Sequence, residues 1–344
     1  MKRMGRLVKA MSNPRTNAGV EKKRHSMTME GFVALLLVVI LAALYFTTGG
    51  TAGFFSAQNI INVLRVWSYL FIAGIGMTMI IITGNIDISY GAVISVIAIV
   101  MAAVSKIDTS IQWWVFIPCG MVTGALLCGF NAWMMARFKI TSMVITLATT
   151  QIYYGALLLV LEGYIYNLRS NWTWIYNKAN LFNGYLPLLV LIAFLLLIAA
   201  VFFFRYSRFC KKLYAIGNNK RGAIYAGINV DRTLIITYMI GGALLAFSSA
   251  ILATSGKRVT CTVGNAVEMK VIAACVVGGT SAIGGSGNIY GTALGALLLA
   301  IISPALSQLG IDTNWTDLFT GIIIVAAIIV SALKNLEKPG TGKR

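Results

Sequence analysis

Residues able to carry out chemistry are few in this sequence and lie far apart. The only histidine is His25, and the acids in or near apolar segments are Asp87, Glu162, Glu268 and Asp317. No two of these acids have the spacing that would pair them on one helix for acid–base catalysis or metal binding. No Gly-x-x-x-x-Gly-Lys-Ser/Thr stretch for nucleotide phosphates is present either. We therefore expect that the chain is not an enzyme and binds no metal or cofactor itself.

The five cysteines do not change this expectation. They are Cys119, Cys128, Cys210, Cys261 and Cys275, and no two form a Cys-x-x-Cys pair. With a single histidine in the chain, a structural zinc site is not expected. Four of the five fall in or beside apolar segments, where cysteine behaves as a small hydrophobe.

Asp87 is the acid that the sequence singles out. It stands between Asn85 and Ser89 at the start of an otherwise apolar stretch, and a carboxylate at membrane depth costs roughly 2.5–3.5 kcal/mol on insertion scales. One interpretation is helix capping, in which Asp87 accepts free amides at the start of the following helix. The other is that Asp87 lines a solute path or carries a proton. We favour capping, because Asp-Ile-Ser precedes the apolar stretch as a cap should.

Composition indicates what surrounds these residues. The chain is 58% hydrophobic and 11% charged, whereas soluble domains average about 25% charged residues. This deficit extends along the whole chain and predicts an integral membrane protein. In a soluble protein the net charge of +18 would suggest nucleic acid. Here the basic residues cluster between apolar segments, so topology and anionic membrane lipid explain them, and we expect no nucleic-acid partner.

The apolar segments predict an all-α, polytopic membrane protein with ten transmembrane helices and both termini cytoplasmic. With both termini inside, 21 basic residues fall on the inner side and six on the outer side, which is a strong positive-inside signal. The predicted domains are a basic tail at 1–30, a transmembrane domain at 31–333 and a basic C-terminus at 334–344. The predicted spans are 31–48, 60–83, 87–105, 113–136, 142–162, 186–204, 233–255, 269–284, 288–310 and 316–333.

Two segments break the helical pattern, TGNIDISYG at 83–91 and GGTSAIGGSGNIYG at 278–291. Backbone without helical hydrogen bonds inside a membrane must be buried in protein or line a cavity. Glycine-interrupted segments in the two halves of a carrier point to the solute path. The alternative is a pair of surface turns that use glycine for positive φ. Gly-Asn-Ile occurs in both segments, which hints at an internal, inverted repeat of spans two to five and seven to ten.

A polar segment at 205–232 separates two apolar ones and contains seven basic residues and one acid, Asp231. Within it, Lys220–Tyr225 is compatible with a short helix that Gly227 would end. A short helix lying flat on the membrane surface is what a peripheral ATPase would grip. A basic loop bound to lipid headgroups explains the composition as well, and the residues alone do not rank the two.

Three segments together resemble bacterial ATP-binding-cassette permeases for simple sugars, the ribose-type family, which is related to branched-chain amino acid permeases. AIGNNKRGAIYAGINVDRTLIITYMIGGALLAFSSAILATSG at 215–256 is similar to the family's coupling region. TGNIDISYGAVISV at 83–96 resembles its Gly-x-Ile-Asp-(Leu/Ile)-Ser-x-Gly segment. VIAACVVGGTSAIGGSGNIYGTALGALLLAII at 271–302 resembles its Gly-Gly-Thr-Ser segment. The three keep the family's order.

This resemblance implies a permease subunit of an importer in a bacterial cytoplasmic (inner) membrane. Its implied partners are a cytoplasmic ATPase that binds the ATP, a second identical or different permease subunit, and a periplasmic or lipid-anchored sugar-binding protein. The implied ATPase-coupling residues are Lys220, Arg221, Gly222, Ala223, Tyr225, Gly227, Ile228 and Asn229. The implied residues of the translocation path are Asn85, Asp87, Ser89, Gly91, Gly278, Gly279, Thr280 and Ser281.

One departure concerns the coupling contact. The family typically has acids before an Ala-Ala pair, whereas this chain has Lys220 and Arg221, followed by Gly222 and Ala223. The facing groove of the ATPase should then differ in charge from the usual one, or these side chains point into solvent. Two other functions stay open: the same machine for a branched-chain amino acid, a nucleoside or a signalling sugar derivative, and an ion-coupled secondary carrier. The carrier would need a titrating acid such as Asp87.

Overall fold

The computed structural model describes most of the region between the two termini. The described residues are 29–48, 50, 53–107, 113–162, 165–167, 180–181, 186–256, 258–312, 315–322, 325 and 329. The predicted tail at 1–30, most of residues 163–185 and the predicted C-terminus at 334–344 therefore lie wholly or mostly outside the described residues.

Eight helices of the described residues are long and apolar enough to cross a membrane. They are α2 (Met29–Thr47), α3 (Ala57–Ile82), α4 (Tyr90–Ile107), α5 (Trp113–Phe138), α6 (Ser142–Leu161), α8 (Leu188–Tyr206), α11 (Val230–Gly256) and α13 (Ile289–Gln308). Three shorter helices are α9 (Arg208–Asn218), α10 (Lys220–Tyr225) and α12 (Val267–Val277). The predicted all-α polytopic fold is confirmed, and the predicted short helix at Lys220–Tyr225 has the bounds that the sequence indicated.

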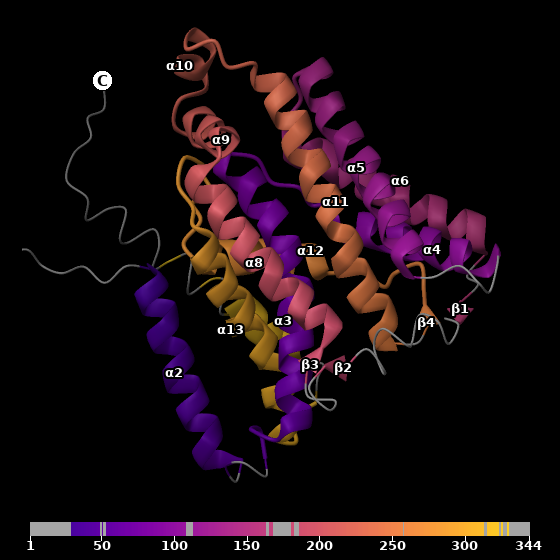
Figure 1. Ribbon diagram of the computed structural model, residues 1–344, viewed down its shortest axis with the longest axis vertical. Coiled ribbons are helices and arrows are strands. Elements are labelled where there is room, and N and C mark those ends of the chain that lie inside the picture. The colour runs from indigo at the N-terminus through magenta and orange to yellow at the C-terminus, as the bar shows by residue number, and fades with distance from the viewer. Residues whose placement is uncertain are drawn as a thin grey trace, which may run out of the picture.

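Two small antiparallel strand pairs accompany the helices. β1 (Tyr166–Asn167) pairs with β4 (Arg258–Val259), and β2 (Asn180–Leu181) pairs with β3 (Leu186–Pro187). Both pairs lie at the end of the bundle opposite α9 and α10 (Figure 1).

The ninth predicted span differs from the structure. A span at 269–284 was expected, but α12 has 11 residues, or roughly 16 Å of helix, about half of a hydrocarbon core of about 30 Å. The helix ends at Val277 because Gly278 packs against the backbone of Gly291, where any side chain would collide, and Gly279 adopts φ +93°. Of the tenth predicted span, 316–333, the described residues 316–322, 325 and 329 are helical.

Helix α3 forms the centre of the bundle. It contacts α11, α13, α12 and α8, and Figure 1 shows these helices around it. Every residue from Leu70 to Ile82 is buried, which is the pattern of a helix that is apolar on all sides and enclosed by others. Helix α2 lies at one edge of the bundle and packs on α13.

Glycines bring the central helices close together. A Cβ atom on Gly124 of α5 would collide with the carbonyl oxygen of Gly242 on α11, and one on Gly242 would collide with that of Gly124. A Cβ atom on Gly76 of α3 would lie 2.6 Å from the Cα atom of Gly241. Small residues at helix crossings allow backbones to approach in this way and favour packing between membrane helices. The α3–α11–α5 contact is therefore built on glycine.

Candidate functional site

The two glycine-containing breaks meet in the structure. The amide of Gly285 donates to the carbonyl oxygen of Ile82, the last residue of α3, at 2.9 Å. A Cβ atom on Gly284 would lie 2.7 Å from the amide nitrogen of Gly84. Both Gly84 and Gly284 have positive φ, +79° and +94°, which glycine adopts without strain. Segments 83–89 and 278–288, far apart in the sequence, thus form one junction.

Helix α9 is fastened to this junction. The hydroxyl of Tyr214 donates to the carbonyl oxygen of Gly287 at 2.8 Å, and Asn218 Nδ2 donates to the carbonyl oxygen of Gly285 at 3.0 Å. A Cβ atom on Gly217 would collide with the carbonyl oxygen of Ile82. The sequence analysis did not single out these three residues. The only sign of this contact in the sequence was that two side chains able to donate hydrogen bonds, Tyr214 and Asn218, lie close to Gly217 in an amphipathic segment.

Helix α9 also has a buried face, formed by Cys210, Leu213 and Ile216. Leu213 packs with Met79 and Ile82 of α3. Burial raises the pKa of the Cys210 thiol from 9.0 to about 12, because a thiolate would lose its hydration there. This thiol is accordingly neutral and unreactive at physiological pH.

Helix α10 follows α9, and it is fixed by a cap at its first turn and by the packing of its buried side. The Asn219 side chain caps it by accepting the Gly222 amide at 2.9 Å. Ala223 is 4% exposed and packs with Ile216 of α9 and with Val230 and Leu234 of α11. A displacement of α10 would therefore be passed to both neighbouring helices.

The outer face of α10 is free among the described residues. Tyr225 is 91% exposed and Ile224 is 55% exposed, and Lys220 and Arg221 are exposed beside them. Gly227 ends the turn at φ +79° with open space around its Cα.

The last two predicted coupling residues connect α10 to α11. The Ile228 amide donates to the Ala223 carbonyl oxygen at 3.0 Å. Asn229 Oδ1 accepts the amide of Arg232 at 3.0 Å, in the first turn of α11. The predicted coupling residues thus all lie in one short exposed element and its connection to α11.

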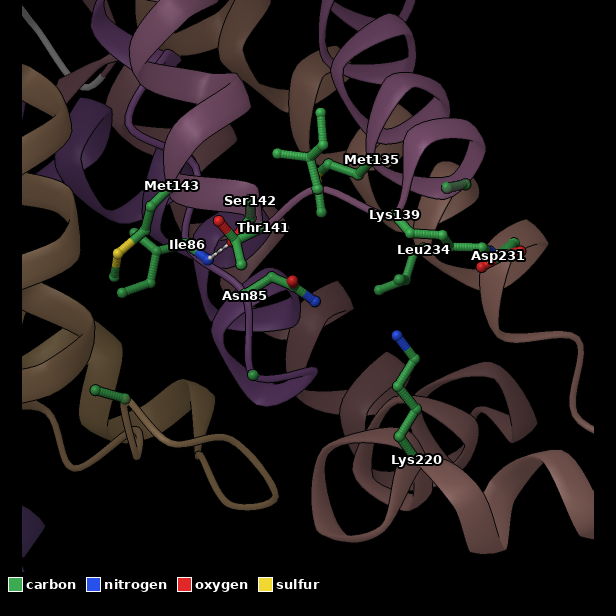
Figure 2. Close-up of a pocket in the computed structure, with 14 residues that line it drawn as sticks. Asn85, Ile86, Met135, Lys139, Thr141, Ser142, Met143, Lys220, Asp231 and Leu234 are labelled. Carbon is green, nitrogen blue, oxygen red and sulfur yellow. Dashed lines mark hydrogen bonds and ion pairs between the residues drawn. The ribbon is translucent and has the colours of Figure 1, made fainter.

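A cavity of about 410 Å³ opens between this element and the α3–α4 break. Figure 2 shows Lys220 directing its ammonium group into it from α10, opposite Asn85. Lys139, which follows α5, forms an ion pair at 2.7 Å with Asp231 of α11 at the same cavity. Of the eight predicted path residues, only Asn85 lines the cavity. From the second break, Ala282 lines it.

The non-helical backbone behind the cavity is hydrogen-bonded by side chains of α6. Ser142 Oγ accepts the amide of Ile86 at 3.2 Å (Figure 2), and Thr146 Oγ1 accepts the amide of Ile88 at 3.1 Å. Extended backbone at membrane depth requires such partners. The sequence analysis missed both hydroxyls, which lie four residues apart and therefore on one face of α6.

Asp87 is buried, with no exposed surface. Its Oδ1 accepts the amide of Ser89 at 2.9 Å and the hydroxyl of Ser89 at 2.6 Å. Helix α4 begins at Tyr90, and the Ser89 carbonyl oxygen accepts its first helical hydrogen bond, from the Val93 amide. Ser89 is therefore the residue that precedes the helix, and the prediction that Asp87 accepts amides of α4 is wrong: Asp87 holds the turn before it. Whether Asp87 also contacts a solute stays a prediction.

The remaining predicted path residues lie deeper or nearer α2. Gly91 packs so closely on Gly264 and Glu268 that a Cβ atom would collide with both. Thr280 is 2% exposed, and its amide donates to the carbonyl oxygen of Cys275 at 2.9 Å. The amide of Ser281 donates to the Ser286 carbonyl oxygen at 3.0 Å. A Cβ atom on Gly279 would approach Met29 of α2.

The repeated Gly-Asn-Ile has different roles in the two breaks. Asn288 is the N-cap of α13, and its Oδ1 accepts the amide of Tyr290 at 3.1 Å. Asn85 instead bonds back to Thr83, and α4 begins five residues after it. The shared residues Gly-Asn-Ile therefore do not occupy structurally equivalent positions in the two breaks.

These features define a class of protein. Among the described residues no group of three His, Cys, Asp or Glu side chains could hold a metal ion. What the site offers is an exposed surface element, fastened through α9 to two broken segments that border a cavity with both charged and apolar lining. A multi-pass helical bundle with this arrangement is suited to passing a solute across a membrane.

Comparison with known proteins assigns the chain more narrowly. Residues 59–328 match the family described as "Branched-chain amino acid transport system / permease component", and the chain belongs to this family. It is therefore a multi-pass membrane permease component and not an enzyme.

The alignments to individual relatives extend over most of each relative and most of this chain. The ribose import permease protein RbsC of Bacillus subtilis (strain 168) is 30% identical over 307 residues, covering 88% of this chain and 92% of that protein. RbsC of Haemophilus influenzae is 28% identical over 322 residues, covering 92% and 96%. The xylose transport system permease protein XylH of Escherichia coli (strain K12) is 27% identical over 362 residues, covering 88% and 92%. No solved structure matches the chain.

Proposed function

We propose that this chain is the permease subunit of an ATP-binding-cassette importer that carries a simple sugar, of the ribose or xylose kind, across a bacterial cytoplasmic membrane. The relatives named for ribose and xylose support the solute class. The partners are a cytoplasmic ATPase that binds the ATP, a second permease subunit and a sugar-binding protein on the outer side. Membrane lipid surrounds the bundle.

We place the α9–α10 end of the bundle in the cytoplasm. Arg205, Arg208, Lys211, Lys212, Lys220, Arg221 and Arg232 belong to this end or its approaches. Basic loops are retained on the cytoplasmic side of a membrane. This orientation presents the exposed Tyr225 to a cytoplasmic ATPase.

The observation that carries the proposal is the fastening of α9 to both breaks. A push on α10 is passed through Ala223 to α9 and α11. From α9 it passes through Tyr214 and Asn218 to the 278–288 segment, and from Gly285 to the end of α3. Movement of this junction against the α5–α6 connection, which lines the cavity as well, would open or close the cavity beside Asn85, which is the requirement for alternating access.

The test is co-purification of an ATPase with the full-length chain from its native membrane. Wild type is compared with Tyr225→Asp, which places a charge on the exposed tip of α10 and touches no buried residue. Ile107→Asp is the matched control, because Ile107 is 79% exposed and is the last residue of α4, a helix separate from α10. We expect ATPase activity in the eluate of wild type and of Ile107→Asp, and its loss with Tyr225→Asp.

Two results would count against the proposal. If no ATPase accompanies the wild-type chain under gentle solubilisation, or if sugar uptake continues after ATP depletion and stops with loss of the proton gradient, an ion-coupled carrier replaces the importer. If an ATPase co-purifies but the cells that contain this chain use it to import an amino acid or a nucleoside instead of pentoses, the assignment as an ATP-driven importer holds and the assigned solute class is wrong.

A further inference from the structure

Behind the cavity, four side chains form a line of hydrogen bonds from α6 to the α3–α4 break. The hydroxyl of Tyr153 donates to Asn131 Oδ1 at 2.9 Å, and Asn131 Nδ2 donates to Ser89 Oγ at 2.8 Å. Ser89 Oγ then donates to Asp87 Oδ1 at 2.6 Å. All four residues are buried, the most exposed being Tyr153 at 8%.

Every donor in this line points towards Asp87. A carboxylate at the end of a polarised chain of donors is held in one orientation, because each hydrogen bond strengthens the next. Its Oδ1 receives the hydroxyl and the amide of Ser89, whereas Oδ2 is buried and accepts no hydrogen bond from the described residues. A buried acceptor without a donor is costly, so Oδ2 is suited to a donor that arrives from elsewhere.

The surroundings of Asp87 combine aromatic and small residues. Tyr90, Cys128 and Tyr238 are fully buried near its carboxylate. The hydroxyl of Tyr90 lies where α3 and α11 cross: Cβ atoms on Gly76 and Gly241 would each clash with it. The hydroxyl of Tyr90 also lacks a partner among the described residues. Aromatic faces with a few well-placed polar groups are the usual lining of small-molecule sites.

The position of Asp87 relates this cluster to the cavity. Asn85 and Ile86, directly before it in the chain, line the cavity wall, together with Ser142, which holds the Ile86 amide. Asp87 therefore lies immediately behind the inner wall of the cavity. Contact between Oδ2 and the cavity contents requires a movement of the 83–89 segment that exposes Asp87.

We propose that Asp87 Oδ2 accepts a hydroxyl group of the solute, and that Asn131 and Tyr153 are positioning residues that hold the carboxylate for it. The ligand class is a neutral, polyhydroxylated molecule of pentose size. The inference rests on the proposed function and adds two residues from α5 and α6 to the predicted solute path. A cation at Oδ2 is the other occupant that the experiment distinguishes.

The experiment measures binding of radiolabelled ribose and xylose to the intact transporter, purified without its sugar-binding protein, by equilibrium dialysis. Tyr153→Phe removes the first donor and keeps the ring, and Asn131→Leu removes the central link at similar volume. Tyr154→Phe is the matched control, since Tyr154 is the neighbouring tyrosine and lies outside the line. We expect the Kd to rise about fivefold in Tyr153→Phe, more in Asn131→Leu, and less than about twofold in the control.

A panel of singly deoxygenated pentoses separates positioning from general loosening of the fold. Wild type should lose affinity for at least one analogue, and Tyr153→Phe should reduce that discrimination. A merely structural change would weaken all the sugars alike and would overturn the assignment. Thermal unfolding of each variant confirms that it is folded, and Tyr153→Phe, which keeps the buried ring, provides the decisive comparison if Asn131→Leu fails to fold.

Other outcomes are equally informative. If both variants bind sugar as wild type does, or if wild type binds none, the inference is wrong even though the transporter imports sugar. If affinity depends on Na⁺ or on proton concentration and not on a hydroxyl of the sugar, Oδ2 is a cation site and the proposal is overturned. If the intact transporter with its binding protein imports no sugar at all, the proposed function fails first.

Discussion

The amide of Gly285 donates a hydrogen bond to the carbonyl oxygen of Ile82 at 2.9 Å. This one contact joins the segment after α12 to the end of α3, the central helix of the bundle. Because Asn218 of α9 donates to the carbonyl oxygen of the same Gly285, three segments from different parts of the chain meet at this one residue. Changes at this point should affect all three together.

Gly217→Ala tests the close approach of α9. The added methyl group would collide with the carbonyl oxygen of Ile82, and overpacking of this kind costs about 1–3 kcal/mol. We expect transport to fall roughly tenfold or more and the thermal midpoint to decrease. Gly155→Ala in α6 is the control, because the new methyl group would meet no described atom within 4 Å apart from its chain neighbours and its own helix backbone; there, stability should stay equal or rise by up to about 1 kcal/mol. Equal behaviour of the two variants would contradict the fastening of α9.

Tyr214→Phe and Asn218→Ala test the hydrogen bonds of the same junction. Each change removes a donor to a glycine carbonyl oxygen, at 2.8 Å and 3.0 Å respectively, and a net cost of about 0.5–1.5 kcal/mol each is expected. If α9 transmits movement, the number of ATP molecules hydrolysed per solute imported should rise in both variants. Tyr206→Phe is the control, since this tyrosine is 63% exposed. An unchanged ratio in the double variant would mean that α9 is a passive support.

Thr146→Val tests the hydrogen bonding of the α3–α4 break. It deletes the acceptor of the partly buried Ile88 amide, so the unfolding free energy should fall by about 1–3 kcal/mol. Thr150→Val, one helical turn further on, removes only a donor to the carbonyl oxygen of Thr146 within the same helix and should cost less than about 0.5 kcal/mol. Chemical unfolding in detergent compares the two. Equal losses would show that the break does not depend on α6.

Cys210 provides a pH-dependent report on α9. Burial raises its pKa from 9.0 to about 12, so the unfolded chain releases this proton at lower pH than the folded chain. Stability from this group is complete below about pH 9 and declines as pH rises from 9 towards 12. Maleimide labelling of Cys210 should therefore stay slow between pH 7 and pH 10 in the folded protein. Rapid labelling that follows the thiolate fraction of a free cysteine would mean that α9 is not docked.

The Lys139–Asp231 ion pair should contribute little to stability. Its side chains are 68% and 48% exposed, and exposed pairs are typically worth 0–1 kcal/mol. We expect Asp231→Asn to lower the unfolding free energy by less than about 1 kcal/mol, with no difference from wild type at about 1 M salt, where screening is nearly complete. A larger or salt-resistant loss would assign this pair a role beyond a surface contact.

Sequence alone was sufficient for the class of fold and for the short surface helix. Apolar segments longer than a membrane is thick must be helical, because only a helix satisfies its own backbone in lipid. The bounds Lys220–Tyr225 followed from local residues and from Gly227, which ends the helix and has positive φ. The family resemblance rested on similarly local segments.

The tertiary structure decided which of these segments meet. Nothing in the spacing of Gly84, Gly217 and Gly285 indicates that the three pack together, since a glycine's role depends on the backbone that approaches it. Asn131 and Tyr153 read as ordinary helix residues, and only the packing of α5 and α6 brings their side chains into line with Ser89. The predicted span at 269–284 was too long for the same reason: close contact with α13 ends α12 at Gly278. Local sequence determines helices, whereas contacts between distant segments depend on the whole fold.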